Sequence, residues 1–152
     1  MITLSDCKRP LKGVPLVGAL GCLWLASTAY GAPAQSTSAL LQCHVTYGGS
    51  TQILEVRPVS DPYPVPSVDI GGRFRFKAVM VGQVRQIESI AIYVYLDTAR
   101  QPLLIHHARH MPPYRTSTVI GQTYNLTGQQ HLYAGPAERE LIYQCMLQGV
   151  KP

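Results

Sequence analysis

Apolar and polar residues alternate with a period of two along several short stretches of the chain. From Leu41 to Tyr47 every second residue is apolar, and the residues between them are polar. Such alternation is typical of a strand that buries one face. Glycines and a serine follow at 48–50, and residues 51–59 form a second run rich in β-branched residues. The pattern therefore predicts a β-hairpin.

The middle of the chain predicts three more strands after an irregular connection. Residues 60–72 contain three prolines and two glycines, which predicts an extended connection or a sheet edge closed by a glycine turn. Residues 73–82 alternate cleanly, with Phe74 and Phe76 on the inward side. Residues 89–97 are apolar on both faces, as in a central strand. Residues 102–110 predict the next strand.

The last part of the chain is less regular. Residues 111–130 show no convincing period and predict a long loop with at most one short strand. Residues 130–147 predict a hairpin about Ala134-Gly135-Pro136. About seven short strands and no helix indicate an all-β fold, a small antiparallel β-sandwich with immunoglobulin-like layers. A small β-barrel is the alternative.

The first 34 residues have the layout of a secretory signal peptide. A basic segment ends at Lys12, an apolar run extends from Val14 to Ala26, and small residues follow. Cleavage is expected after Ala29, Gly31 or Ala34. Residues 35–152 then form a single domain of ordinary size, which is not an integral membrane protein after cleavage.

Two cysteines remain after the predicted cleavage, Cys43 and Cys145. In an exported protein two lone cysteines most simply form a disulfide, here on the inward faces of the first and last strands. The only tryptophan of the chain, Trp24, lies in the signal peptide. The chain therefore lacks the Cys…Trp…Cys pattern of true immunoglobulin domains.

The charge of the mature chain is modest. Ten Lys/Arg against seven Asp/Glu in residues 35–152 leave +3, compared with +5 for the whole chain. A charge of this size favours solubility and does not indicate a nucleic-acid partner.

Two sets of side chains are candidates for binding. Arg73, Arg75 and Lys77 form a basic stripe that could meet an anionic ligand or an acidic protein. Arg57, Arg85 or Arg109 would extend the stripe if one of them lay beside it. Tyr93 and Tyr95 share a strand face and could add an aromatic recognition surface. The simpler interpretations are a solvated strand face and tyrosines that complete a core.

Histidines gather in residues 104–110, LIHHARH. On a helix His106 and His110 would share a metal ion, but on a strand they lie about 13 Å apart, too far for one ion. A transition-metal or haem site would therefore need His44 or His131 from another strand. The simpler interpretation of the stretch is an exposed polar strand face.

These patterns predict a periplasmic or secreted, non-enzymatic module of the bacterial cell envelope. It would bind an envelope protein or an anionic surface ligand and carry no cofactor. The alternatives are a metal or haem carrier that uses the histidines, and a small secreted enzyme. The enzyme has little support because the mature chain contains no G-x-S-x-G, H-E-x-x-H, P-loop or C-x-x-C motif.

Overall fold

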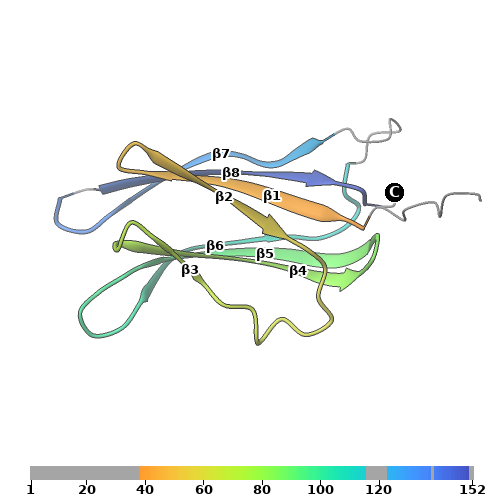
Figure 1. Ribbon diagram of the computed structural model, residues 1–152, viewed down its shortest axis with the longest axis horizontal. Helices are drawn as coiled ribbons and strands as arrows, with labels where there is room; N and C mark the ends of the chain where they lie inside the picture. Colours follow the sequence, from red (N-terminus) through yellow and green to blue (C-terminus); the bar gives the residue numbers. More distant parts are fainter. Residues whose placement is uncertain (1–37, 116–122, 138, 151–152) are drawn as a thin grey trace, which may run out of the picture. The chain divides into compact units, whose positions relative to one another are not determined.

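Two antiparallel four-stranded sheets make up the described part of the protein, which in this computed structural model comprises residues 38–115, 123–137 and 139–150 (Figure 1). The predicted signal peptide lies outside the described residues. Sheet A contains β1 (Leu40–Tyr47), β2 (Ser50–Val56), β7 (Tyr124–Ala134) and β8 (Arg139–Gln148), in the order β2-β1-β8-β7. Sheet B contains β3 (Val68–Ile70), β4 (Phe74–Gln83), β5 (Gln86–Leu96) and β6 (Leu103–His110), in the order β3-β4-β5-β6.

The predicted β-sandwich is confirmed, and the alternative of a closed barrel is wrong. The two sheets are separate layers whose inner faces share one hydrophobic core (Figure 1). Eight strands are present among the described residues, one more than the count of about seven. Those residues also contain no helix with the length and apolar character that a membrane crossing requires.

The predicted hairpins are present, and glycine makes the first of them tight. Tyr47 pairs with Ser50, so only Gly48 and Gly49 lie in the turn between β1 and β2. Their φ angles are +57° and +80°, values that glycine adopts without steric cost. The last hairpin, between β7 and β8, turns at Gly135 as predicted.

Strand β7 corrects the prediction of a loop over residues 111–130. This strand begins at Tyr124, and an irregularity between Asn125 and Gln129 shifts its register against β8. Within the bulge Gly128 has a φ of +65°, and the Thr127 hydroxyl accepts the backbone N–H of Cys145 at 2.9 Å. A bulge breaks the period of two, and this break hid the strand in the sequence.

Alternation decides which side chains form the core. The inward residues of β1, β4 and β8 are those that the sequence predicted. Most inward residues of these strands and of β5 are almost completely buried, namely Leu41, Cys43, Val45, Phe74, Phe76, Met80, Ile90, Ile92, Val94, Leu141, Tyr143, Cys145 and Leu147. Phe76 of sheet B packs edge-on against Tyr143 of sheet A, with ring centroids 5.4 Å apart.

The predicted disulfide between Cys43 and Cys145 is present, and both cysteines are completely buried. The two residues lie directly opposite each other on β1 and β8, with Cα atoms 4.0 Å apart. The bond therefore joins neighbouring strands of one sheet. In immunoglobulin domains the corresponding bond joins the two sheets.

Candidate functional site

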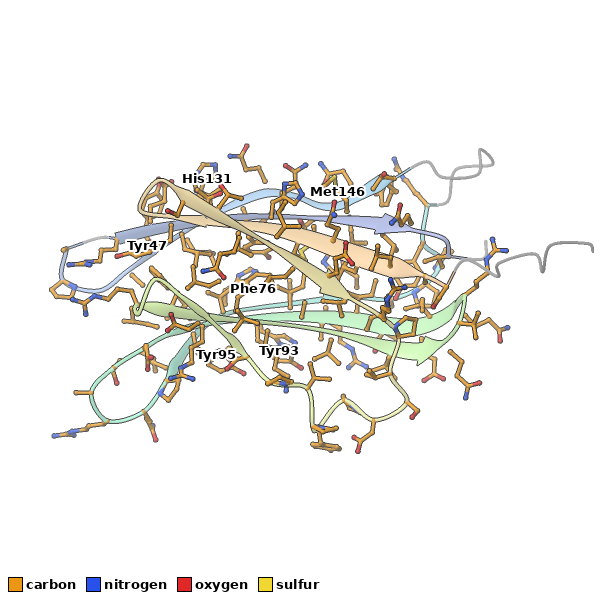
Figure 2. All side chains as sticks on the ribbon, viewed as in Figure 1. Tyr47, Phe76, Tyr93, Tyr95, His131 and Met146 are labelled. Carbon is orange, nitrogen blue, oxygen red and sulfur yellow. A yellow bond between two sulfur atoms is a disulfide. The ribbon has the colours of Figure 1, made fainter. Side chains whose placement is uncertain are left out.

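The outer face of sheet B brings basic and aromatic side chains together. Lys77 on β4 lies opposite Tyr93 on β5, and Tyr93 lies opposite His107 on β6. Directly opposed residues of antiparallel strands project to the same face. We call the following six residues the basic–aromatic face: Arg75, Lys77, Tyr93, Tyr95, His107 and Arg109. Figure 2 shows Phe76 between the layers, with Tyr93 and Tyr95 on the side of sheet B away from sheet A.

The rings on this face stack on one another. The ring centroids of Tyr93 and His107 are 4.5 Å apart and their planes differ by 5°. Tyr93 and Tyr95 are also stacked, at 6.4 Å and 17°. Stacking covers part of each ring and fixes its direction, so the side chains offer hydrogen-bonding groups in set positions rather than mobile ones.

The cations of this face differ in their surroundings. Arg75 donates from Nε to Oδ2 of Asp97 at 3.2 Å, and its Nη2 lies 3.2 Å from the same oxygen. Asp69 lies opposite Arg75 on β3. Lys77 and Arg109, in contrast, have no ion-pair partner among the described residues. These two cations therefore provide uncompensated positive charge on the face.

A groove of about 240 Å³ opens beside the stacked rings. Three residues of the basic–aromatic face, Arg75, Lys77 and Tyr95, line it together with Val65, Ser67 and Pro102. Val65 and Ser67 come from the proline-rich connection between β2 and β3, and Pro102 directly precedes β6. The groove thus has a floor on the sheet and side walls from two segments distant in the sequence.

Another hollow, of about 840 Å³, lies near the turn between β4 and β5. Among the described residues that line it, Glu88 is the one charged residue. The hollow thus has no cation in its described lining, whereas the groove on sheet B has Arg75 and Lys77. We therefore regard the groove and the basic–aromatic face as the candidate site.

The structure places the predicted basic stripe only in part on the sheet. Arg75 and Lys77 lie on β4 as predicted, whereas Arg73 lies in the turn before it. Arg109 does lie on the same face, opposite Ala91 of β5. The place of His107 on this face and the walls of the groove were not predicted from the sequence. Alternation puts Tyr93 and Tyr95 on one face of their strand, and the pairing of β5 with β6 then puts His107 on that same face.

The histidines of LIHHARH differ from the predicted exposed polar face. Only His107 is exposed on the outer side; His106 and His110 lie opposite Val94 and Ile90, which face the core. His106 Nε2 lies 2.8 Å from the Tyr143 hydroxyl. His110 Nε2 is buried, and no described residue forms a hydrogen bond with it. Burial lowers the pKa of both histidines, and the charge of His107 lowers that of His106 further.

The other two candidate metal ligands lie on the far side of the molecule. His44 and His131 belong to sheet A and face away from the core, as Figure 2 shows for His131. His44 Nε2 lies 3.4 Å from Oε1 of Gln42. The structure therefore does not bring these histidines near His106 or His110. Among the described residues, no three His, Cys, Asp or Glu side chains are grouped as metal ligands would be.

His131 belongs to a small polar cluster instead. Its Nδ1 lies 2.6 Å from Oε1 of Glu140, and the Tyr133 hydroxyl donates to the same oxygen at 2.7 Å. These two hydrogen bonds lower the pKa of Glu140, and the bond to Glu140 raises the pKa of Tyr133. The cluster is exposed, and its groups satisfy one another. Glu138, its neighbour in the sequence, lies outside the described residues.

Comparison of the chain with protein-family models, with curated proteins and with solved structures gave no match.

Proposed function

We propose that the protein is an exported, non-enzymatic binding module of a bacterial cell envelope, and that it holds an anionic partner on the basic–aromatic face of sheet B. One observation carries this proposal. Lys77 and Arg109 lie without an ion-pair partner in the described residues on the same face as the stacked rings of Tyr93 and His107.

The chemistry of the face suits an anion with oxygen acceptors. Arg and Lys form short, charge-assisted hydrogen bonds to carboxylate, sulfate and phosphate oxygens. Tyrosine and arginine are enriched in recognition surfaces, where rigid rings offer contact area at a low entropic cost. The excess positive charge also attracts an anionic partner during diffusional encounter.

Two features support export. The N-terminal residues have the order of a signal peptide, with a basic segment, a short apolar run and small residues. The Cys43–Cys145 bond is of the kind that forms and persists in oxidising compartments such as the bacterial periplasm. Expression of the full chain in a Gram-negative bacterium, followed by fractionation and mass measurement, tests this part. Recovery of the uncleaved chain from the cytoplasm would contradict it.

Retention on a sulfated-polysaccharide resin tests the binding face. The test variant is Lys77→Gln with Arg109→Gln, and the control is Arg57→Gln with Arg115→Gln. Both pairs remove two positive charges, but the control residues lie outside the face. We expect the test variant to elute at a clearly lower salt concentration than the control. Equal elution would show that net charge alone causes retention, and the proposal would then fail.

A further inference from the structure

We propose that the groove beside the basic–aromatic face is a subsite for one acidic sugar residue of a linear anionic polysaccharide. This inference rests on the proposed function, because it assigns a ligand to the same face. The sugar would place its carboxylate on the Arg75 and Lys77 side of the groove, while the rest of the chain follows the stacked rings toward Arg109.

The charge of the groove matches a group with a single negative charge. Arg75 and Lys77 line the groove, and Asp97 neutralises one of these two charges through its contact with Arg75. Asp69 lies opposite Arg75 on β3 as well, so Lys77 is the cation of the groove that has no ion-pair partner among the described residues. A uronate carboxylate carries one negative charge at neutral pH, whereas a phosphate monoester carries nearly two. The charge of the groove therefore favours a uronate carboxylate over a phosphate monoester.

Asp97 also fixes the direction of the arginine. The Nε and one terminal nitrogen of Arg75 both contact the same carboxylate oxygen at 3.2 Å. The other terminal nitrogen has no side-chain partner among the described residues, so it remains a donor in a set position. A guanidinium held in this way loses little freedom when it binds an oxyanion.

The floor of the groove favours a sugar over a peptide. Arg75 pairs with both β3 and β5, and Tyr95 pairs with both β4 and β6, whereas Lys77 pairs with β5 alone. Most backbone groups of the floor are therefore engaged within sheet B. An extended peptide usually gains affinity from backbone hydrogen bonds at a sheet edge. This floor offers mainly side chains. A sugar residue, which presents hydroxyl and carboxylate oxygens around a ring, uses side-chain donors fully.

Size and polarity agree with a single residue of a polymer. The volume of about 240 Å³ is below the ~300–1,000 Å³ that is typical of sites for whole small ligands. Val65 and Pro102 provide apolar wall surface, while Ser67 and Tyr95 carry hydroxyl groups. A pyranose ring has apolar faces and polar edges, so it complements walls of mixed character.

Calorimetric titration of the mature protein tests the ligand class. The probes are trigalacturonate, the neutral galactotriose, a hexaglutamate peptide and vesicles of phosphatidylglycerol. We expect trigalacturonate to bind at least tenfold more tightly than galactotriose and hexaglutamate. Binding of vesicles or peptide without binding of trigalacturonate would overturn the sugar assignment but leave the proposed anionic face intact. Binding of no anionic probe would count against both proposals.

Variants of one wall residue locate the ligand. Val65→Glu adds a negative charge to the groove. Val65→Gln is its control, because glutamine is neutral and nearly the same size as glutamate. We expect Val65→Glu to weaken trigalacturonate binding at least tenfold and Val65→Gln less than about threefold. Equal effects of the two variants would overturn the assignment of the carboxylate to the groove. If Val65→Glu binds normally while Arg109→Gln does not, the ligand lies on the face outside the groove.

Discussion

The imidazole Nε2 of His106 lies 2.8 Å from the hydroxyl oxygen of Tyr143, and this contact joins the inner faces of the two sheets. Tyr143 is almost completely buried, and its burial raises the pKa of the phenol to about 12. The hydroxyl therefore stays protonated at neutral pH and needs a partner inside the core. His106 supplies this partner, so each polar group satisfies the other where water is excluded.

Replacement of Tyr143 by phenylalanine removes this hydrogen bond without removing the ring. We expect Tyr143→Phe to lower the free energy of unfolding by about 1–2 kcal/mol, because His106 loses its partner inside the core. Urea unfolding at pH 7 measures the change. Tyr133→Phe is the matched control, since the Tyr133 hydroxyl is bound to Glu140 on an exposed surface. The control should change stability by less than about 0.5 kcal/mol.

The disulfide closes a long loop, because its two cysteines are separated by 102 positions in the sequence. A cross-link of this length restricts the unfolded chain strongly, and we expect its loss to reduce stability by about 2–5 kcal/mol. The double variant Cys43→Ala/Cys145→Ala and the reduced parent protein should both show this loss in urea unfolding. Mass spectrometry of the protein purified without reductant checks the bond, and two free thiols at Cys43 and Cys145 would contradict the structure.

The sequence predicted those parts of the fold that depend on a regular period. Alternation about Phe74 and Phe76 identified the inward face of β4, and the same period placed Cys43 and Cys145 on inward faces. The prediction missed β7 because the bulge at Asn125–Gln129 interrupts the alternation. A bulge depends on contacts with the neighbouring strand, here on Thr127 and Cys145. Such contacts cannot be deduced from local sequence.

The candidate site was predictable in its outward residues but not in its assembly. Arg75 and Lys77 could be assigned to outer positions from their own strand, whereas the side of Tyr93 stayed open because both faces of its strand are apolar. The groove, in contrast, requires Val65 and Pro102 to lie on either side of the sheet, and this depends on the path of two irregular segments. The inward direction of His106 was missed because a histidine inside a core is uncommon unless a partner such as Tyr143 is known.

Gly82 allows β4 and β5 to approach closely at a register shift between Val81 and Gly82. A Cβ at Gly82 would lie 2.8 Å from Cα of Ile87 and closer still to the carbonyl oxygen of Gln86, and the φ angle is +149°. We expect Gly82→Ala to lower stability by about 2–3 kcal/mol. Gly128→Ala is the control, because a Cβ there would contact nothing within 4 Å. Its cost should be about 1 kcal/mol, which reflects only the positive φ.

The inward histidines of β6 predict a loss of stability in mild acid. Burial lowers the pKa of His106 and His110 below the usual 6.5, so the unfolded chain takes up protons first as the pH falls. Protonation then stabilises the unfolded state more than the folded one. The free energy of unfolding should therefore be nearly constant above pH ~7.5 and fall steadily from about pH 7 to pH 5.

Urea unfolding at several pH values checks this dependence. The pH series should end near pH 5. The pKa of Glu140 is lowered from its usual 4.5, so the change in stability that Glu140 causes falls in more acidic solution. In the variant His106→Gln/His110→Gln both inward imidazoles are gone, and we expect the slope between pH 7 and pH 5 to flatten. An unchanged slope would show that other groups cause the acid sensitivity. A slope of opposite sign in the parent protein would mean that the folded state favours the charged histidines, contrary to their burial.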